Sequence, residues 1–306
     1  MARVSFPSPG WVRDVGEIEG IEPLVWHPDD PVPDGPIDVV VAPYIGAAGC
    51  IASVAHVDGV RLVQLLTAGY DGIFERVPER IAVANAAGVH DDSTAELTLA
   101  LILAAQRGIP DFARAQTEGA WLRLGFLPSL ADRRVVVIGY GGVGRAIVAR
   151  LLPFRAEVIA VASTARDGDE FVDQVHGMTD LASLLPTAEV VVLALPLTEA
   201  TRGLVDDDFL GALPDDALVV NIARGAVVDT EAVLRHTDRL RFALDVTEPE
   251  PLPPDHPLWT APGVLITPHV GGPSTAFRPR AVAMLREQLT RIASGQPPIH
   301  LVRGGA

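Results

Sequence analysis

The chain has 306 residues, of which 48% are hydrophobic and 21% charged, a composition that indicates a globular protein long enough for two domains. Its 24 basic and 39 acidic residues give a formal net charge of −15. This charge argues against nucleic acid and anionic membranes as main partners, because both require clustered lysine and arginine.

One cysteine, Cys50, excludes an internal disulfide and is expected to be a small buried side chain. No cysteine and histidine residues have the spacing of a metal site, so we expect no bound metal. The first residues lack the apolar core of a signal peptide, and the longest apolar run, Leu97 to Ala105, is too short to cross a bilayer. A cytoplasmic location is therefore the expectation.

Short apolar runs separated by Pro, Gly and Asp occupy the first ninety residues, at 24–26, 38–41, 62–66 and 81–84. Runs of this length are typical of parallel strands covered on both faces, so a small α/β unit is predicted. The segment Ser93-Thr94-Ala95-Glu96 predicts a capping box that opens a helix, and Gly108 with Pro110 predicts its end. The helix is apolar all round, which predicts burial between layers or domains.

From Arg134 onward the chain alternates apolar strand patterns with helical ones. The predicted strands are 135–138, 158–161, 190–193, 218–220, 242–244 and 264–266. Strands separated by helices predict a parallel, doubly wound sheet. A last helical pattern covers 276–294, and its distance from the final strand suggests that it returns to the first domain.

The loop Gly139-Tyr140-Gly141-Gly142-Val143-Gly144 lies between a predicted strand and a predicted helix. In that context Gly139 permits a tight turn, Gly141 lets the backbone approach a pyrophosphate, and Gly144 allows the helix to pack on the strand. Free N–H groups at the helix start would face the phosphates. The alternative is an ordinary glycine-rich turn, which the flanking elements disfavour.

The second strand of this unit ends at Ala162, where an NAD-binding chain would carry an acidic residue for the ribose. Ser163, Thr164 and Arg166 follow it, and these side chains would accommodate the 2′-phosphate of NADP by donating charge-assisted hydrogen bonds to it. We therefore favour NADP over NAD. The alternative is that Arg166 is solvated in a mobile loop, and the aspartates at positions 167 and 169 weigh in its favour.

Three polar residues each follow a predicted buried strand: Arg224, Glu250 and His269. The carboxyl ends of parallel strands share one edge of a sheet, where such folds bind their ligands. Taken singly, each residue is explained by a salt bridge or a cap. Together they supply an electrostatic anchor, an acid/base group and its carboxylate partner.

These residues and their order resemble the D-isomer-specific 2-hydroxyacid dehydrogenase family, which includes glyoxylate/hydroxypyruvate reductases and phosphoglycerate dehydrogenases. The matching segments are 139–144, 195–204, 221–225, 245–251, 255–259 and 267–272. In the first half, 67–71 is similar to the family's substrate-carboxylate loop, and 85–96 is similar to its crossover into the cofactor domain.

The resemblance implies a Rossmann-type, doubly wound parallel sheet as the cofactor domain, inserted into a smaller flavodoxin-like α/β substrate domain. Residues 1–92 with 273–306 would form the substrate domain, and 93–272 the dinucleotide-binding domain. Small 2-oxoacids would bind in the cleft between them. A homodimer is implied by the resemblance only.

Catalytic roles also follow from the resemblance. Arg224 would bind the substrate carboxylate and its C2 oxygen, and His269 would donate a proton to that oxygen. Glu250 would pair with the imidazole and keep it protonated for reduction near neutral pH. Both Glu248 and Glu250 precede a proline, and the spacing from the preceding Asp-Val pair selects Glu250.

Binding roles follow in the same way. Backbone amides of Ala68 and Gly69 would hold the other side of the substrate carboxylate, and Asp245 would lie near the nicotinamide carboxamide. The whole predicted cofactor-binding set is Thr94, Gly139, Gly141, Gly142, Val143, Gly144, Ser163, Thr164, Arg166, Leu195, Pro196, Ile222, Ala223, Arg224, Asp245, His269, Gly271 and Gly272.

The chain also departs from the family pattern. Thr247 replaces an aromatic residue, and the segment 273–280 is rich in Pro and Arg. Arg278 or Arg280 could reach a substrate tail, although a surface role is favoured. Two alternative functions remain: a dinucleotide-sensing corepressor, and a formate dehydrogenase-like enzyme, which would be expected to carry Gln in place of Glu250.

Overall fold

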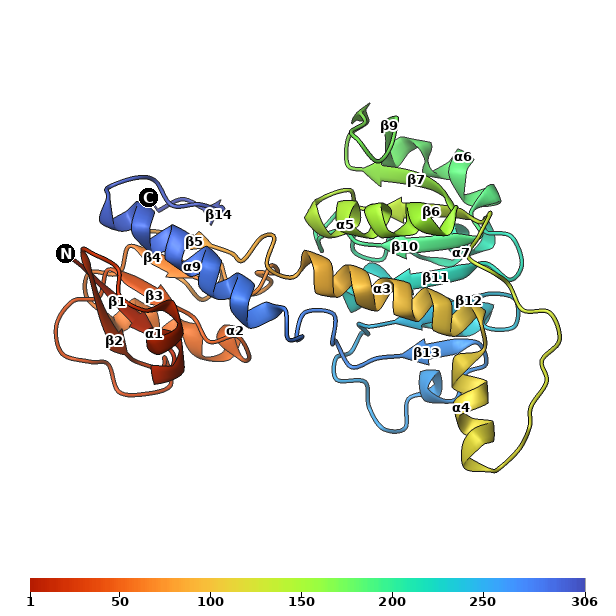
Figure 1. The fold of residues 1–306 in the computed structure, drawn as a ribbon, viewed down its shortest axis with the longest axis horizontal. Coiled ribbons are helices and arrows are strands. Elements are labelled where there is room, and N and C mark those ends of the chain that lie inside the picture. Colours follow the sequence, from red (N-terminus) through yellow and green to blue (C-terminus); the bar gives the residue numbers. More distant parts are fainter. Residues whose placement is uncertain (306) are drawn as a thin grey trace. The chain divides into compact units, whose positions relative to one another are not determined.

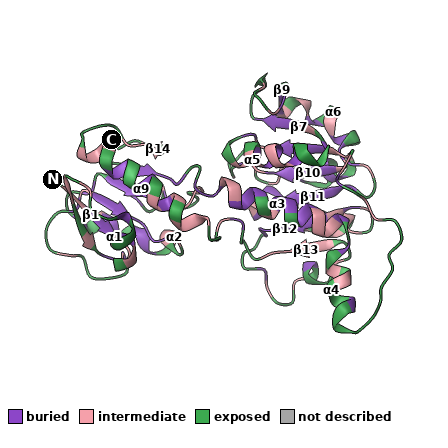
Figure 2. Ribbon diagram, in the orientation of Figure 1, coloured by how far each residue is buried: buried purple, intermediate pink, exposed green. Residues whose placement is uncertain are grey.

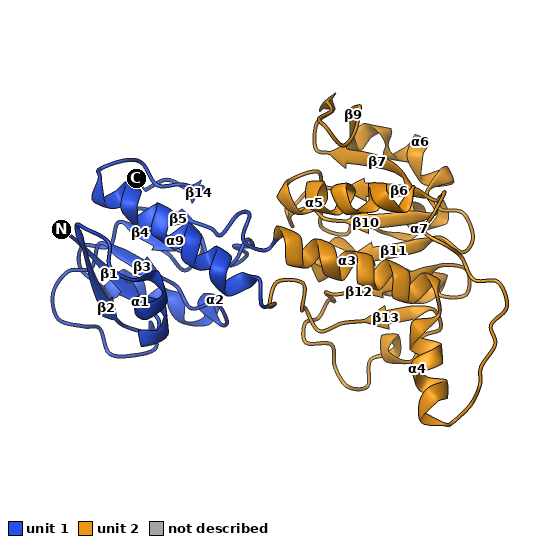
Figure 3. Ribbon diagram, in the orientation of Figure 1, with its two compact units in different colours: residues 1–90, 275–306 blue, residues 91–274 orange. Residues whose placement is uncertain are grey.

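The computed structural model describes residues 1–305, which form two compact units (Figure 3). Unit 1 comprises Met1–His90 and the chain from Thr275 onward, and unit 2 comprises Asp91–Ser274. The change of unit lies at His90, before the predicted boundary at Asp92, because helix α3 already begins at Asp91.

Unit 1 is built on a six-stranded sheet with the order β14-β5-β4-β3-β1-β2 (Figure 1). The first five strands of the chain are parallel, and β14 is antiparallel to β5. Their order 2-1-3-4-5 is that of flavodoxin-like folds. The bounds are β1 Ala2–Phe6, β2 Ile21–Val25, β3 Val39–Val41, β4 Leu62–Gln64, β5 Ala82–Ala84, β14 Leu301–Arg303, α1 Pro9–Val15, α2 Ala47–Cys50 and α9 Phe277–Ala293.

The carboxy-terminal helix α9 belongs to the core of unit 1. Its buried residues Ala281, Leu285 and Leu289 share one apolar cluster with Val4 and Phe6 of β1. The opposite face of the sheet packs on a second cluster that contains the short helix α2 and the 3-10 turn after it, Ile51–His56. Both faces of the sheet are therefore covered, as the continuous apolar strands require.

Unit 2 is built on an eight-stranded sheet with the order β13-β12-β11-β10-β6-β7-β9-β8. All pairs are parallel except β8 with β9. The order reverses between β6 and β10, which is the place where doubly wound sheets bind dinucleotides. The bounds are β6 Arg134–Ile138, β7 Glu157–Ala162, β8 Arg166–Asp167, β9 Gln174–Gly177, β10 Val190–Leu193, β11 Leu218–Asn221, β12 Arg241–Leu244, β13 Val264–Ile266, α3 Asp91–Gln106, α4 Ile109–Thr117, α5 Gly142–Leu151, α6 Leu181–Leu184, α7 Asp207–Gly211 and α8 Thr230–His236.

Successive residues of β6 serve two different cores, as the two-residue period of a strand dictates. Val135 and Val137 pack with α3 and α5, whereas Val136 and Ile138 pack with α7 and α8. Figure 2 shows the inner strands β10 and β11 as buried. The predicted fold class is confirmed, and this covered sheet fixes its strand ends as a rigid platform.

One predicted helix boundary is wrong. Helix α3 begins at Asp91, and Ser93 does not cap it; its hydroxyl donates instead to the carbonyl of Gly272 at 3.4 Å. The predicted end is confirmed: α3 stops at Gln106, Gly108 follows in a left-handed conformation, and Pro110 lies beyond α3, in the first turn of α4. Proline is tolerated there because the first turn of a helix has no acceptor for its N–H groups.

Four short strands were not predicted from the sequence: β1, β8, β9 and β14. Among residues 1–305, none of the helices has both the length and the apolar character needed to span a bilayer.

Candidate active site

Arg224, Glu250 and His269 follow three neighbouring strands of unit 2. β11 pairs with β12 at Asn221 and Leu244, and β12 pairs with β13 at Leu244 and Ile266. The three parallel strands therefore end at one level, and the loops that carry the three residues leave the same edge of the sheet. We call these loops, residues 222–225, 245–251 and 267–272, the catalytic edge.

The imidazole of His269 is bonded to the carboxylate of Glu250, with 2.7 Å between Nδ1 and Oε1. Both side chains are nearly half exposed, at 47% and 43%. Because Nδ1 is directed at the carboxylate, Nε2 is the ring nitrogen left to exchange a proton with a ligand. Of the two glutamates that precede proline, Glu250 is thus the one whose carboxylate reaches the histidine.

The backbone of His269 is in the left-handed region, with φ of 53°. A non-glycine residue in this region is uncommon and persists where its surroundings hold it. The amide of His269 donates to the carbonyl of Asp245 at 2.8 Å, and the side chain of Asp245 accepts bonds from Thr267 Oγ1, Val270 N and Gly271 N at 2.6, 2.9 and 2.9 Å. The buried Asp245 therefore fixes the loop that presents the imidazole.

The resemblance placed Asp245 near the nicotinamide, and that role stays a prediction. The hydrogen bonds by which Asp245 fixes the loop of His269 were not predicted, because nothing in the sequence indicates a contact between position 245 and positions 267–271. The only signal was an acidic residue directly after the apolar run 242–244.

Arg224 lies in a turn that Asn221 organises. Asn221 is buried; its Oδ1 accepts the amide of Ala223, and its Nδ2 donates to the carbonyl of Arg224, both at 3.0 Å. A Cβ on Gly225 would lie 1.9 Å from the carbonyl oxygen of Thr247, so glycine is required where this turn packs on the next loop. The guanidinium of Arg224 donates to the carbonyl of Ala223 at 2.6 Å.

The glycine loop after β6 has the close contacts that a dinucleotide cradle needs. A Cβ on Gly139 would lie 2.2 Å from the carbonyl oxygen of Ala194, and one on Gly144 would lie 1.8 Å from the carbonyl oxygen of Gly139. Gly139 has φ of 106°, and Gly141 has no neighbour within 4 Å of its Cβ position. α5 begins at Gly142, so its first N–H groups have no acceptor within the helix, which is the feature by which helix starts bind a pyrophosphate.

Other predicted cofactor residues of unit 2 lie near this loop or on the catalytic edge. Thr94 Oγ1 donates to the carbonyl of Gly271 at 3.3 Å, next to the bond between Ser93 and Gly272. The others are placed by their strands and helices: Val143 in the first turn of α5, Leu195 and Pro196 after β10, and the buried Ile222 and Ala223 after β11.

Ser163 and Thr164 are exposed in the bend after β7, and Arg166 begins β8. Nη2 of Arg166 donates to the carbonyl of Tyr140, in the glycine loop, at 2.9 Å. Arg166 is therefore bonded to the glycine loop, whereas the alternative interpretation has it solvated in a mobile loop. The carboxylate of Asp169 faces Arg145, with 2.8 Å between Oδ2 and Nε, so its charge is matched within the protein.

The predicted substrate loop of unit 1 follows β4. Thr67 Oγ1 donates to the carbonyl of Gly69, and Asn85 Nδ2 donates to the carbonyl of Ala68, both at 2.7 Å. These bonds occupy the carbonyl groups of the loop and fix its shape. That the amides of Ala68 and Gly69 bind a carboxylate stays a prediction.

Arg278 is engaged within unit 1. Its Nη2 lies 2.8 Å from Asp14, and its guanidinium lies 3.5 Å from the centre of the Trp11 ring. These contacts anchor α9 to α1 and support the surface role of this arginine.

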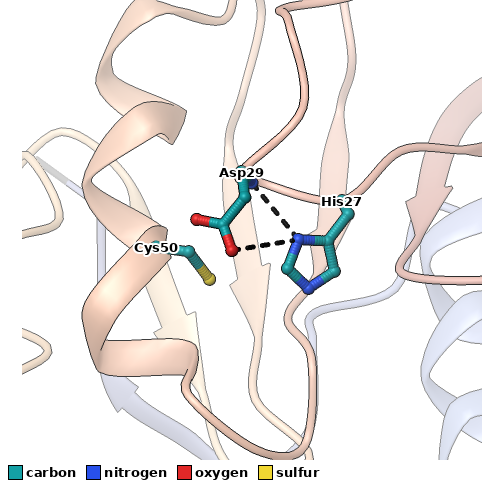
Figure 4. Close-up of side chains that lie close together, drawn as sticks. All are labelled: His27, Asp29 and Cys50. Atoms are coloured by element: carbon teal, nitrogen blue, oxygen red, sulfur yellow. Dashed lines mark hydrogen bonds and ion pairs between the residues drawn. The ribbon is translucent and has the colours of Figure 1, made fainter.

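A cluster of a different kind lies in unit 1, where His27, Asp29 and Cys50 face one another (Figure 4). Their nitrogen, oxygen and sulfur atoms lie within 4.8 Å of one another, and such donors suit zinc. The sequence spacing missed the cluster because Cys50 comes from another element, α2.

Contacts within the protein explain why these three side chains lie close together without a metal ion. His27 Nδ1 already accepts the amide of Asp29 at 3.2 Å, within a turn closed by the bond from Asp30 N to the carbonyl of His27. Burial, and then the charge of Asp29, raise the pKa of the Cys50 thiol, which keeps it protonated. We assign no metal to it.

Comparison with known proteins agrees with this geometry. Residues 99–271 match the family model described as D-isomer specific 2-hydroxyacid dehydrogenase, NAD binding domain. The chain is 32% identical to a glyoxylate reductase of Thermofilum pendens, over 79% of this chain and 75% of the relative. It is 31% identical to a glyoxylate reductase/hydroxypyruvate reductase of Mus musculus, over 80% of each.

Among solved structures, a D-isomer specific 2-hydroxyacid dehydrogenase of Xanthobacter autotrophicus Py2 in complex with NADPH and MES is similar over 98% of this chain and 97% of its own, at 30% identity and a TM-score of 0.82. The chain therefore belongs to the D-isomer-specific 2-hydroxyacid dehydrogenase family, and it is an NAD(P)-dependent oxidoreductase of small 2-hydroxyacids.

Proposed function

We propose that the protein reduces small 2-oxoacids of the glyoxylate and hydroxypyruvate type to D-2-hydroxyacids, with NADPH as the preferred reductant. The observation that carries the proposal is the pair of His269 and Glu250 on the edge that also presents Arg224. The names of the Thermofilum pendens and mouse relatives support the substrate class.

Each residue of the catalytic edge has a chemical task in this reaction. Arg224 offers a planar, permanently charged fork that suits the carboxylate and the adjacent C2 oxygen of a 2-oxoacid. His269 gives its Nε2 proton to that oxygen as the carbon is reduced, and Glu250 stabilises the imidazolium before the transfer. The dinucleotide, when bound, supplies the hydride that reaches C2. The sum is a 2-oxoacid, NADPH and a proton converted to a 2-hydroxyacid and NADP⁺.

The preference for NADPH rests on the end of β7. Ala162 stands where a carboxylate would repel a 2′-phosphate, and the exposed Ser163, Thr164 and Arg166 offer hydroxyl and guanidinium donors. The Xanthobacter autotrophicus relative, which was solved with NADPH, supports the same choice. The division of labour between a substrate domain, 1–92 with 273–306, and a cofactor domain, 93–272, is part of this proposal.

We also propose a homodimer, for which the segment after α4 provides the support. Within six residues, Trp121, Leu122, Leu124 and Phe126 are exposed, and Trp121 is 89% exposed. Exposed large apolar side chains concentrated in one segment are typical of a protein–protein interface. In light scattering, Trp121→Ser with Phe126→Ser should convert a dimer into a monomer, and a wild-type monomer would refute the assignment. The proposed location is the cytoplasm, where reduced dinucleotides are available.

The direct test is a panel of 2-oxoacids assayed with NADPH and with NADH. We expect glyoxylate and hydroxypyruvate to be reduced, with a higher kcat/KM for NADPH. No oxidation of either cofactor with any 2-oxoacid would refute the proposal. Cofactor-dependent peptide binding without turnover would instead favour a corepressor, and formate oxidation would favour the formate dehydrogenase-like alternative.

A further inference from the structure

Arg166 is presented by a side-chain network that the catalytic chemistry does not use. Its guanidinium bonds to the carbonyl of Tyr140 at 2.9 Å and lies 5.9 Å from the centre of the Tyr140 ring, within cation–π range. A long exposed arginine otherwise loses much rotamer entropy when a ligand fixes it. Tyr140 reduces that loss by holding the side chain in place beforehand.

Tyr140 in turn is fixed by Asp169. The tyrosine ring is buried, and its hydroxyl donates to Asp169 Oδ1 at 2.8 Å. The same carboxylate accepts the amide of Phe171 at 2.9 Å and Nε of Arg145 at 2.8 Å. Arg145 lies in the first half of α5, which leaves the glycine loop. One carboxylate therefore joins the glycine loop, the helix after it and the turn between β8 and β9.

The hairpin formed by β8 and β9 carries both Arg166 and Asp169. It is antiparallel, with Asp167 opposite Gln174, and its turn is tight: a Cβ on Gly168 would lie 1.8 Å from the carbonyl oxygen of Val172. β8 has only two residues, so a strand this short holds little position by itself. The bonds of Asp169 supply the tie that the short strand lacks.

The charges in this network are balanced around Arg145. Its guanidinium contacts both Asp169 and Glu170, the latter at 2.5 Å, and lies 4.7 Å from the centre of the Phe171 ring. Backbone and side-chain donors hold the pKa of the Asp169 carboxyl at about 2, so it is charged at neutral pH. This charge is directed at Arg145 and Tyr140, so the guanidinium of Arg166 stays available to a phosphate.

We infer that Asp169 is a positioning residue for dinucleotide selectivity: by tying the β8–β9 hairpin to Tyr140 and Arg145, it holds Arg166 where the 2′-phosphate of NADPH is recognised. The inference rests on the proposed preference for NADPH. It goes beyond that preference because it assigns a role in cofactor selectivity to a carboxylate. A carboxylate near a phosphate is ordinarily unfavourable, since the two negative charges repel each other.

The test is Asp169→Asn, with Asp167→Asn as its matched control on the same hairpin. If a nearby negative charge merely repels the 2′-phosphate, both substitutions tighten NADPH binding. If Asp169 positions Arg166, Asp169→Asn raises the KM and Kd for NADPH about tenfold and those for NADH less than twofold, because the lost bonds are charge-assisted. Asp167→Asn, whose side chain is exposed, should leave NADPH binding equal or slightly tighter.

Tyr140→Phe is a milder second variant, since it removes only the hydroxyl that reaches Asp169. It should weaken NADPH binding severalfold and leave NADH binding unaltered. Binding is measured by quenching of protein fluorescence, so that the result does not depend on turnover, and the melting temperature of each variant is recorded.

The outcomes separate this inference from the proposed cofactor. Unchanged or tighter NADPH binding in Asp169→Asn, or an equal loss for both cofactors, overturns the positioning role even if Arg166→Ala still abolishes selectivity. A wild-type protein without any preference for NADPH overturns the proposed cofactor and the inference together.

Discussion

Two regions of unit 2 hold their functional side chains in different ways. On the catalytic edge, Arg224 and His269 lie in loops that follow parallel strands of the sheet, and buried Asn221 and Asp245 fix these loops. At the far side of the sheet, Arg166 stands on a two-residue strand that owes its position to an exposed network around Asp169. The comparison teaches that the reaction chemistry is built into the sheet, whereas cofactor choice depends on side chains added to it.

The largest effect is expected at the glycine loop, which both regions need. Gly144→Ala places a methyl group 1.8 Å from the carbonyl of Gly139, so α5 must move away from β6. We expect a loss of about 1–3 kcal/mol in unfolding free energy and no measurable binding of either cofactor. The measurement is chemical denaturation together with NADPH and NADH titration.

Gly141→Ala is the matched comparison within that loop. Its Cβ meets nothing within 4 Å in the protein, so the fold should keep its stability while the pyrophosphate loses its close approach to the backbone. Equal stability loss in both variants would show that the two glycines do not have separate tasks.

On the catalytic edge, Glu250→Gln should reduce kcat/KM roughly a hundredfold, because the neutral amide of glutamine cannot stabilise the imidazolium that donates the proton. Affinity for NADPH should change little, since Glu250 acts on the substrate side of the reaction. Steady-state kinetics with glyoxylate measures both parameters.

Glu248→Gln provides the control, because Glu248 also precedes a proline and is exposed. It should retain activity within about twofold of the wild type. A comparable loss in the two variants would break the assignment of Glu250 as the partner of His269.

At the selectivity region, Arg166→Ala should lower kcat/KM for NADPH at least tenfold and leave kcat/KM for NADH nearly constant, because only the 2′-phosphate loses a charge-assisted bond. Assays with both cofactors at fixed glyoxylate measure the ratio. If the ratio of kcat/KM for NADPH to kcat/KM for NADH is unchanged, Arg166 does not bind the 2′-phosphate. The comparison between the catalytic edge and the selectivity region would then fail.

The smallest effect concerns acid stability. The pKa of Asp169 is lowered from 3.8 to about 2 in the folded protein, chiefly by the amide of Phe171, with Arg145 and Tyr140 adding to it. A lowered folded-state pKa stabilises the protein above the unfolded value, and this contribution disappears as the pH falls toward 2. The unfolding free energy of Asp169→Asn should therefore be lower than that of the wild type at pH 7, and the difference should vanish near pH 2. A pH-independent difference would contradict this account.

The sequence was sufficient for the catalytic edge because parallel strands end at a common edge of the sheet. Residues that follow such strands therefore converge regardless of their separation along the chain. Family resemblance then distinguished Glu250 from Glu248. The same logic could not reach Asn221 or Asp245 as supports, since their partners are backbone groups whose positions appear only in the folded loops.

The selectivity region was only partly predictable. Ala162 and Arg166 stand out in the sequence because the strand before them ends without the acidic residue of an NAD-binding chain. The bonds of Asp169 could not be predicted, because the two-residue strand β8 is too short to show an alternating hydrophobic pattern. From the sequence alone, Asp169 is expected to weigh against NADP. Only the bonds to Tyr140 and Arg145 reveal that its charge is compensated.

The most direct test of the proposed reaction is NADPH-dependent reduction of glyoxylate by the wild-type protein and by His269→Ala, with NADPH binding measured on the same samples. We predict turnover in the wild type, a loss of about a hundredfold to ten-thousandfold in the variant, and NADPH binding within about twofold of the wild type. Turnover that survives the substitution would contradict the assignment of His269 as the proton donor.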